Sequence, residues 1–242
     1  MTNSYIIVGA GRVGTALASF TDRSLIVRRG ESIPSTSGPI IVCTRNDSLD
    51  TVLSLVPHER RPDLIFVQNG MIHSWLQENS LSNCTQALLY FAVSKRGETP
   101  VDGGGSVVCG PRAEAFAALL RAGNIQCTVV QPAALLALSV EKLLWNCTFG
   151  VLCQYYDQTV GEICRTQEAQ ARNLIAELQE VAQRELHIRL DDLVAQRLID
   201  YSLSIPDYKG AVKEWPWRNG WFWDREQSPL HRHYLQRVIT DL

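Results

Sequence analysis

The sequence predicts an α/β protein in which a doubly wound, parallel β-sheet is followed by an all-helical domain. In the first half of the chain, short apolar runs rich in Val and Ile alternate with helix-like segments. This alternation is typical of a parallel sheet that is covered by helices on both faces. After residue 131 long helical periods follow one another, and no convincing strand pattern remains.

The predicted strands are Tyr5–Val8, Ser24–Val27, Pro39–Cys43, Leu64–Val67, Ala87–Ala92, Ser106–Cys109 and Cys127–Val130. Helices are predicted among them at Val13–Phe20, Ser48–Val56, Met71–Glu78 and Arg112–Arg121, and later at Ala133–Tyr156, Glu162–His187, Asp191–Ser204 and Leu230–Ile239. The glycine-rich segment 101–105 predicts a turn, as a hairpin in the later part of the sheet. Because proline can stand at a helix start, we place the domain boundary before Pro132, giving domains 1–131 and 132–242.

A glycine-rich turn, Gly9-Ala10-Gly11-Arg12-Val13-Gly14, follows the first strand and opens the first helix. In such a turn Gly9 permits the tight bend and Gly11 lets the backbone approach a ligand. Gly14 lets the helix pack closely on the strand. The backbone N–H groups at this place are predicted to hold the pyrophosphate of a dinucleotide.

The residues after the second and third strands bear on the choice of dinucleotide. Arg28 and Arg29 stand where an NAD enzyme usually has an acidic residue, and an arginine fork there suits the 2′-phosphate of NADP. Glu31 could still serve NAD, and a solvated turn is the plainest alternative. Thr44 and Arg45 are candidates for the same cofactor site, although Arg45 could equally be an ordinary loop residue.

Asn69 and Gly70 follow the fourth strand. Ligands of open parallel sheets lie at the carboxyl ends of the strands, so the amide of Asn69 is a candidate to face nicotinamide and substrate. Asn-Gly is also a common turn signal, and that alternative has equal weight.

Lys142 is the candidate catalytic residue of the second half. It interrupts a long apolar helical run, and burying an unpaired ammonium is costly. Asn146, four residues on, shares its helix face, so the pair could donate to a carbonyl and a carboxylate. The alternative is a surface lysine that pairs with Glu141 or another acid.

Composition limits the classes of partner and the cellular compartment that we expect for this protein. The net charge of −2 argues against a nucleic-acid or anionic-membrane surface, which leaves a small molecule as the expected partner. The seven cysteines show no C-x-x-C spacing, so neither a metal site nor disulfides are expected, and reduced thiols fit a cytoplasmic protein.

No signal peptide is expected at the N-terminus, and His231 and His233 are expected at the surface. The apolar run 133–156 contains Glu141, Lys142 and Asn146, which favours a core helix over a membrane span.

Four of the six tryptophans fall within nine residues, at Trp215, Trp217, Trp221 and Trp223. Packing of the terminal helices on the core is the expected role of most of these rings. The alternatives are a wall of the substrate site or the interface of a homodimer.

Several motifs together resemble the ketopantoate reductase (2-dehydropantoate 2-reductase) family over essentially the whole chain. They are the glycine turn, Arg28, Arg45, Asn69-Gly70-Met71, the helix segment Glu141-Lys142-Leu143-Leu144-Trp145-Asn146-Cys147, and Glu214 followed by Asn219-Gly220. The glycines are shared by many dehydrogenases, whereas the lysine helix and the Glu with Asn-Gly are more specific.

The resemblance implies an N-terminal Rossmann-type domain, a helical second domain and NADPH-dependent reduction of a 2-oxo acid. It implies that Lys142 polarises or protonates the carbonyl oxygen and that Glu214 binds a substrate hydroxyl or supports the lysine. Asn69 and Asn146 would orient the substrate, and Ser202 or Ser204 corresponds loosely to a serine of the family.

The chain also departs from the family pattern. Gly150 and Val160 stand where the family has asparagines, and the chain is shorter than most members. These departures leave two alternatives open. One is another NADP-dependent dehydrogenase, of β-hydroxyacid, imine or opine type, and the other is a catalytically silent NADP-binding protein.

Overall fold

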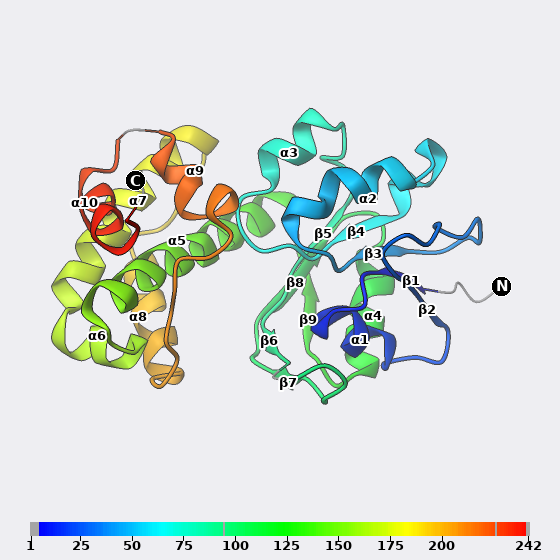
Figure 1. Cartoon of the computed structure of the whole chain (residues 1–242), viewed down its shortest axis with the longest axis horizontal. Coiled ribbons are helices and arrows are strands. Elements are labelled where there is room, and N and C mark those ends of the chain that lie inside the picture. Colours follow the sequence, from blue (N-terminus) through cyan, green and yellow to red (C-terminus); the bar gives the residue numbers. More distant parts are fainter. Residues whose placement is uncertain (1–4, 94, 226, 241–242) are drawn as a thin grey trace. The chain divides into compact units, whose positions relative to one another are not determined.

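The computed structural model describes residues 5–93, 95–225 and 227–240. The chain divides into two compact units, Met1–Leu135 and Leu136–Leu242. The first is an α/β unit and the second is helical, so the predicted fold class is confirmed (Figure 1).

The α/β unit is built on a seven-stranded sheet with the strand order β2-β1-β3-β4-β5-β8-β9. Its strands are β1 (Tyr5–Val8), β2 (Ser24–Val27), β3 (Ile40–Val42), β4 (Leu64–Phe66), β5 (Thr85–Leu88), β8 (Ser106–Cys109) and β9 (Cys127–Val129). The first five strands run parallel, β8 is antiparallel to β5, and β9 is parallel to β8. Because β1 pairs with both β2 and β3, the chain reverses its winding direction at β1, and ligands of such sheets bind at this point.

Four helices cover the sheet: α1 (Arg12–Ala18), α2 (Leu49–Leu55), α3 (His73–Glu78) and α4 (Ala113–Ala122). Alternate strand residues face opposite sides, so Ile65 packs with Leu17 of α1 and Phe116 of α4 in one buried cluster. Phe66, on the other face, contacts the ring of Trp75 in α3 with ring centroids 5.8 Å apart. Figure 1 shows α2 beside α3 on that face. The strand residues are therefore buried from both sides, as their continuous apolar runs predicted.

The segment 87–92, predicted as one strand, is divided in the structure. Strand β5 ends at Leu88, and β6 (Phe91–Ala92) pairs with β7 (Val101–Asp102) in a separate two-stranded sheet. The Ser106 hydroxyl accepts from the backbone N–H of Tyr90, and the Tyr90 carbonyl accepts from Gly103. These bonds occupy the backbone of Tyr90 and take it out of the main ladder, so the predicted hairpin lies outside the main sheet.

The helical unit contains α5 (Pro132–Tyr156), α6 (Val160–Thr166), α7 (Glu168–Leu186), α8 (Val194–Ser204), a 3-10 turn η3 (Trp215–Trp217), α9 (Asn219–Trp223) and α10 (Pro229–Val238). The helix predicted over 162–187 is therefore two helices. The break lies at Gln167, whose φ of −133° is not helical, and a capping box of Thr159 and Glu162 starts α6.

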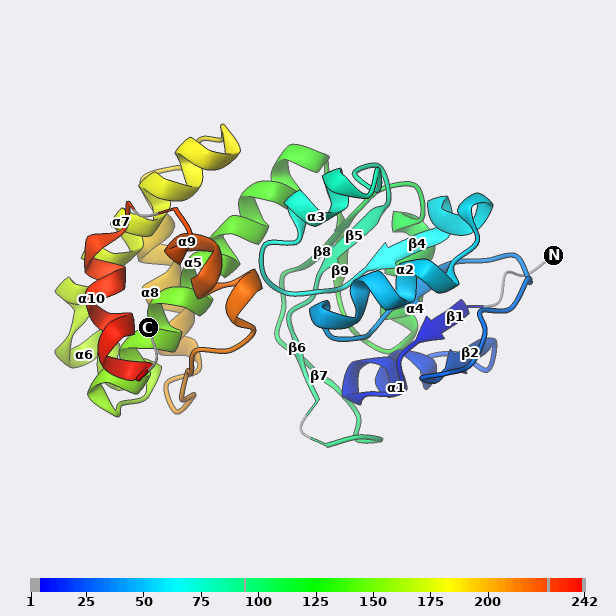
Figure 2. The same ribbon diagram turned by 45° about the horizontal axis from the view of Figure 1, so that its top comes forward.

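Helix α5 is the core of the helical unit, and Figure 2 shows the other helices of the unit around it. Within the described part of the chain it is the one helix long and apolar enough to cross a membrane, yet 61% of that window is buried inside the protein. Consecutive residues from Leu143 to Trp145 and from Cys147 to Cys153 are buried, so every side of this stretch contacts protein. The prediction of a core helix is confirmed.

Candidate functional site

The glycine turn after β1 has the geometry that a bound pyrophosphate requires. Gly9 has a φ of +113°, and a Cβ atom there would lie 2.9 Å from the carbonyl oxygen of Cys43. A Cβ atom at Gly14 would lie 2.0 Å from the carbonyl oxygen of Gly9. Nothing lies within 4 Å of a Cβ atom built at Gly11. Gly9 and Gly14 are thus needed by the fold itself, whereas Gly11 leaves the backbone open to an approaching ligand, so the turn fits a dinucleotide.

The loops that follow β3 and β4 are tied together by side-chain amides. Gln68 donates from Nε2 to the carbonyl oxygens of Val42 and Thr44, at 2.8 and 3.2 Å. The buried Asn46 donates to the carbonyl oxygen of Asn69 at 2.8 Å. These bonds bring Thr44 and Asn69 to the same edge of the sheet. The sequence analysis missed Asn46, although an amide in the loop after a strand was a usable signal.

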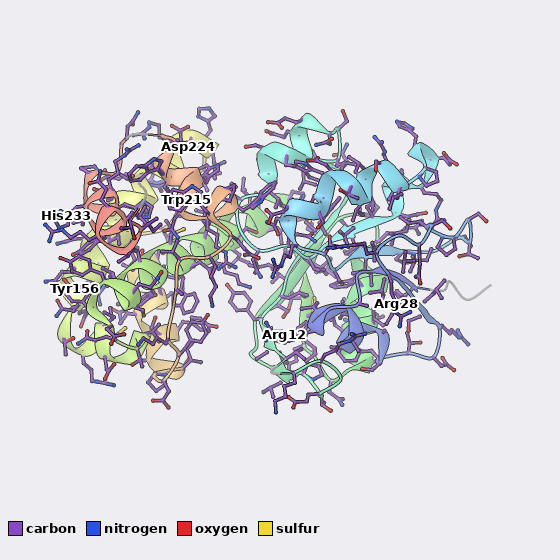
Figure 3. All side chains as sticks on the ribbon, in the orientation of Figure 1. Arg12, Arg28, Tyr156, Trp215, Asp224 and His233 are labelled. Atoms are coloured by element: carbon purple, nitrogen blue, oxygen red, sulfur yellow. The ribbon has the colours of Figure 1, made fainter. Side chains whose placement is uncertain are left out.

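The turn after β2 presents side chains of both charges. The backbone N–H of Arg28 donates to Oε2 of Glu31 at 2.7 Å, and the N–H of Glu31 donates back to the Arg28 carbonyl at 3.0 Å. Arg28, Arg29 and Glu31 are all exposed, and so is Arg45 after β3. Figure 3 labels Arg28 here and Arg12 at the start of α1. The cation expected for NADP and the carboxylate expected for NAD therefore occur in one turn.

In the helical unit, Lys142 is a partly buried residue of α5. Desolvation, together with the nearby guanidinium of Arg218, lowers the pKa of Lys142 to about 7. Both carboxylate oxygens of Glu141 accept hydrogen bonds from Arg197, so this acid has a partner other than Lys142. An ammonium with a pKa near neutrality can serve as a proton donor.

Asn146 links Lys142 to a segment far along the chain. Its Nδ2 donates to the Lys142 carbonyl at 2.7 Å, and its Oδ1 accepts from Nη1 of Arg218 at 3.1 Å. Nη2 of Arg218 pairs with Oε2 of Glu214 at 2.6 Å. The structure therefore brings together Lys142, Asn146 and Glu214, and it adds Arg218. We call these four residues the lysine cluster.

Arg218 was not among the predicted site residues. Its side chain is only 13% exposed, and a charged residue within the tryptophan-rich segment was the available signal. The turn that carries it begins at Glu214, which adopts the left-handed conformation with a φ of 51°. Gly220 packs directly against this turn, since a Cβ atom there would lie 2.6 Å from the Trp215 carbonyl oxygen. A strained non-glycine residue of this kind is held in place by its surroundings.

Two expectations for this unit are wrong. His231 was expected at the surface, but it is fully buried, and its Nε2 is 2.8 Å from Oδ1 of Asn219. Ser202 was expected to bind substrate, but it too is fully buried. Its hydroxyl accepts from Nε1 of Trp145 at 2.9 Å and donates to the Leu198 carbonyl at 2.8 Å. Both hydrogen bonds lie inside the core, so Ser202 is not placed to meet a ligand.

The tryptophans after Glu214 mostly pack within the unit. Trp221 is buried, with the guanidinium carbon of Arg225 3.7 Å from its ring centroid. Trp215, labelled in Figure 3, lies 6.0 Å from Trp223 between ring centroids. Arg232 stacks on Trp223 at 4.2 Å.

The departure from asparagine at position 150 has a packing reason. A Cβ atom at Gly150 would lie 3.0 Å from the Ala211 carbonyl oxygen, and one at Gly210 would lie 2.7 Å from the Phe149 carbonyl oxygen. The segment before Glu214 thus crosses α5 backbone to backbone, which leaves no room for a larger side chain.

The sheet order and the glycine turn give the first unit a Rossmann-type fold. Residues 134–211 of the chain match the family model described as ketopantoate reductase PanE/ApbA C terminal. This match supports the resemblance predicted from the lysine helix: residues 134–211 are similar to the C-terminal domain of the ketopantoate reductase family.

Solved structures of other proteins share this fold. A dimeric ketopantoate reductase from Staphylococcus aureus is 18% identical, with a TM-score of 0.74 over 98% of each chain. A probable 2-dehydropantoate 2-reductase from Bacillus subtilis is 15% identical, with a TM-score of 0.76 over 98% of this chain and 99% of that one. D-mandelate dehydrogenase with NADH and anilino(oxo)acetate is 17% identical, with a TM-score of 0.71 over 98% of this chain and 97% of that one. No protein of curated function matches the chain in sequence.

Proposed function

We propose that the protein is an NADPH-dependent reductase of a small 2-oxo acid, ketopantoate or a related compound. Domain 1–131 binds the cofactor, and domain 132–242 supplies the groups that act on the substrate. The lysine cluster carries this proposal, because it combines a cation that can give up its proton near neutral pH with an amide on the same helix face.

The cofactor is held by the backbone of residues 9–14, with Gly11 at the point of closest approach. Arg28 binds the 2′-phosphate, Thr44 and Arg45 contact the same end of the cofactor, and Asn69 faces the nicotinamide. When bound, the cofactor supplies a hydride to the carbonyl carbon of the substrate.

Lys142 is the acid of the reaction. Reduction of a ketone places negative charge on the carbonyl oxygen, and a prepositioned ammonium stabilises that charge more in the transition state than in the ground state. Lys142 then gives its proton to this oxygen. Asn146 orients the substrate, and Glu214 supports the cluster by fixing Arg218.

The structural relatives support this chemistry. One of them was solved with NADH and anilino(oxo)acetate, an anion in which an amide carbonyl lies next to the carboxylate. Another is a dimeric ketopantoate reductase, so we also propose a homodimer of this chain. The seven cysteines are all free thiols, which fits the reducing cytoplasm, and we propose that compartment.

The test is a spectrophotometric assay of NADPH oxidation with a panel of 2-oxo acids, with and without amines. We expect turnover of at least one 2-oxo acid without amine, and a loss of at least about 100-fold in kcat for Lys142→Ala. Lys213→Ala, an exposed lysine of the same unit, is the control and should match the wild type. Turnover that requires an amine would favour the imine or opine alternative. Stoichiometric NADPH binding without oxidation would favour the silent NADP-binding protein.

A further inference from the structure

One segment of the helical unit lies across α5 and leads to the lysine cluster. We call residues 206–212 the crossing segment; Figure 1 shows the chain between α8 and α9 passing α5. The Pro206 carbonyl oxygen accepts from the N–H of Gly161 at 3.1 Å, and the Tyr208 carbonyl oxygen accepts from the N–H of Val160 at 2.9 Å. These two bonds attach the beginning of the crossing segment to the first turn of α6.

The middle of the crossing segment packs closely on α5. A Cβ atom at Gly210 would lie 2.7 Å from the carbonyl oxygen of Phe149. Such contact limits how near the segment comes to α5, but it does not fix the segment along the helix, because van der Waals contact lacks the directionality of a hydrogen bond. The ion pair of Lys209 with Asp157 adds little, since the Asp157 side chain is 88% exposed.

A side-chain amide of α5 supplies a directed contact. Oε1 of Gln154 accepts from the backbone N–H of Val212 at 2.5 Å. Val212 stands two residues before Glu214, which begins the turn of the lysine cluster. Gln154 is exposed and lies twelve positions after Lys142, about 18 Å along the helix axis. It is therefore too far along α5 to touch the atoms on which Lys142 acts.

The turn that carries Glu214 and Arg218 is thus held on α5 at both ends. Gln154 holds Val212 before the turn, and Asn146 holds Nη1 of Arg218 at its end. The two amides are eight positions apart on one helix, about 12 Å along its axis, so a rigid element sets the distance between the two attachment points. A chain held at both ends has fewer conformations than a chain held at one, so less ordering remains to be done when a ligand binds.

We propose that Gln154 is a positioning residue, which sets the place of Glu214 and Arg218 through the backbone of Val212. The inference rests on the proposed function, in which Asn146 orients the substrate and Glu214 fixes Arg218. Without the contact to Gln154 the crossing segment is free to shift along α5. Asn146 then accepts from a guanidinium that is no longer fixed, and the amide that orients the 2-oxo acid loses its own support.

Three variants test this role. Gln154→Glu keeps an acceptor oxygen at the same place, whereas Gln154→Met keeps the length of the side chain and loses the amide oxygen. Gln158→Met is the matched control, because Gln158 stands two residues after α5 and accepts from the Thr166 hydroxyl at 3.1 Å. All rates are measured below the unfolding temperature of every variant.

The loss of one neutral hydrogen bond corresponds to about 2- to 12-fold. We expect Gln154→Met to lower kcat/KM by that factor for the 2-oxo acid that wild type reduces fastest. KM for NADPH should not change, because the proposed cofactor site lies in the first unit. Gln154→Glu and Gln158→Met should stay within about twofold of the wild type.

A double-mutant cycle shows whether Gln154 acts through Arg218. In the Arg218→Gln background, Gln154→Met should lower kcat/KM less than it does in the wild type, because the guanidinium that it positions is already gone. Equal losses in the two backgrounds would overturn the positioning role. An equal loss in Gln154→Glu and Gln154→Met would overturn it as well.

Backbone hydrogen exchange in the full chain, followed by mass spectrometry, separates this inference from the proposed function. The Val212 amide should exchange about 2- to 12-fold faster in Gln154→Met than in the wild type or Gln154→Glu. If wild type reduces 2-oxo acids and Gln154→Met leaves kcat/KM unchanged, the inference fails and the reductase stands. If wild type reduces nothing and the exchange follows the expected order, the attachment of the turn to Gln154 stands and the reductase fails. If wild type reduces nothing and the exchange is the same in all variants, both are overturned.

Discussion

Gly14 packs so closely on Gly9 that a Cβ atom at position 14 would lie 2.0 Å from the carbonyl oxygen of Gly9. This contact fixes the first turn of α1 against the end of β1. The fold therefore needs glycine at positions 9 and 14. It does not need glycine at position 11, because a Cβ atom there meets nothing within 4 Å.

Alanine substitutions should separate these roles. We expect Gly14→Ala to lower the unfolding temperature or prevent folding, because backbone must move to admit the methyl group. Gly11→Ala should fold with wild-type stability and weaken NADPH binding by about tenfold or more, since its methyl group occupies the place where phosphate approaches. Thermal unfolding and fluorescence titration of NADPH measure the two effects. Wild-type NADPH affinity in a folded Gly11→Ala would contradict the assignment.

The pH dependence of turnover should report Lys142. Its pKa is lowered to about 7, so the proton that it donates is present below pH 7 and lost above it. We expect kcat/KM for a 2-oxo acid to be level below about pH 7 and to fall about tenfold per unit above it. Arg218→Gln removes one of the two causes of the shift and should move the inflection to higher pH. A profile of kcat/KM that stays flat from about pH 7 to 9 would contradict the role of Lys142 as acid.

The same lysine should cost the protein stability. The folded pKa of about 7 lies below the ordinary lysine pKa of 10.5, so between these values the unfolded chain binds more protons than the folded one. The contribution of Lys142 to the free energy of unfolding therefore rises with pH across that window, and it is least favourable at pH 7 and below. Lys142→Met should raise the free energy of unfolding by about 0.5 to 2 kcal/mol at pH 7, and it should lose activity. Denaturant unfolding measures this, with the exposed Lys213→Met as a control that should not change.

Ser202 should matter for stability and not for substrate binding. Removing its hydroxyl leaves the buried Nε1 of Trp145 without an acceptor, which costs about 1 to 3 kcal/mol. Trp145→Phe in the Ser202→Ala background should cost less than Trp145→Phe in the wild type, because the shared hydrogen bond is already gone. A double-mutant cycle by urea unfolding tests this. A raised KM for the 2-oxo acid in folded Ser202→Ala would contradict our view of this residue.

The turn after β2 should decide between the two cofactors. If Arg28 binds the 2′-phosphate, Arg28→Ala should raise KM for NADPH about 10- to 100-fold and leave KM for NADH nearly unchanged. Glu31→Gln keeps an acceptor for the Arg28 backbone N–H and removes a charge that repels phosphate, so it should lower KM for NADPH. If the wild type prefers NADH and Glu31→Gln loses that preference, the assignment of NADPH as the cofactor is reversed. Initial rates with both cofactors provide the measurement.

Most of the fold could be predicted because it depends on local patterns. Continuous runs such as Tyr5–Val8 predict strands buried on two faces, and the structure has β1 over those same residues. The failures lie where a side chain or a turn overrides the pattern. The Ser106 hydroxyl ends β5 early by binding the Tyr90 N–H, and Gln167 breaks the helix predicted over 162–187.

Of the lysine cluster, the sequence by itself indicated Lys142 and Asn146, because a charged residue and an amide four positions apart in an apolar helix share one face. It also indicated the glycine turn, since the positions of Gly9, Gly11 and Gly14 follow from backbone geometry within a few residues. Only the tertiary structure decided that Arg218 joins Asn146 across 72 positions, and that Ser202 belongs to the core. Contacts of such separation depend on how α5, α8 and the segment before α9 pack together, and local propensity contains no information about that packing.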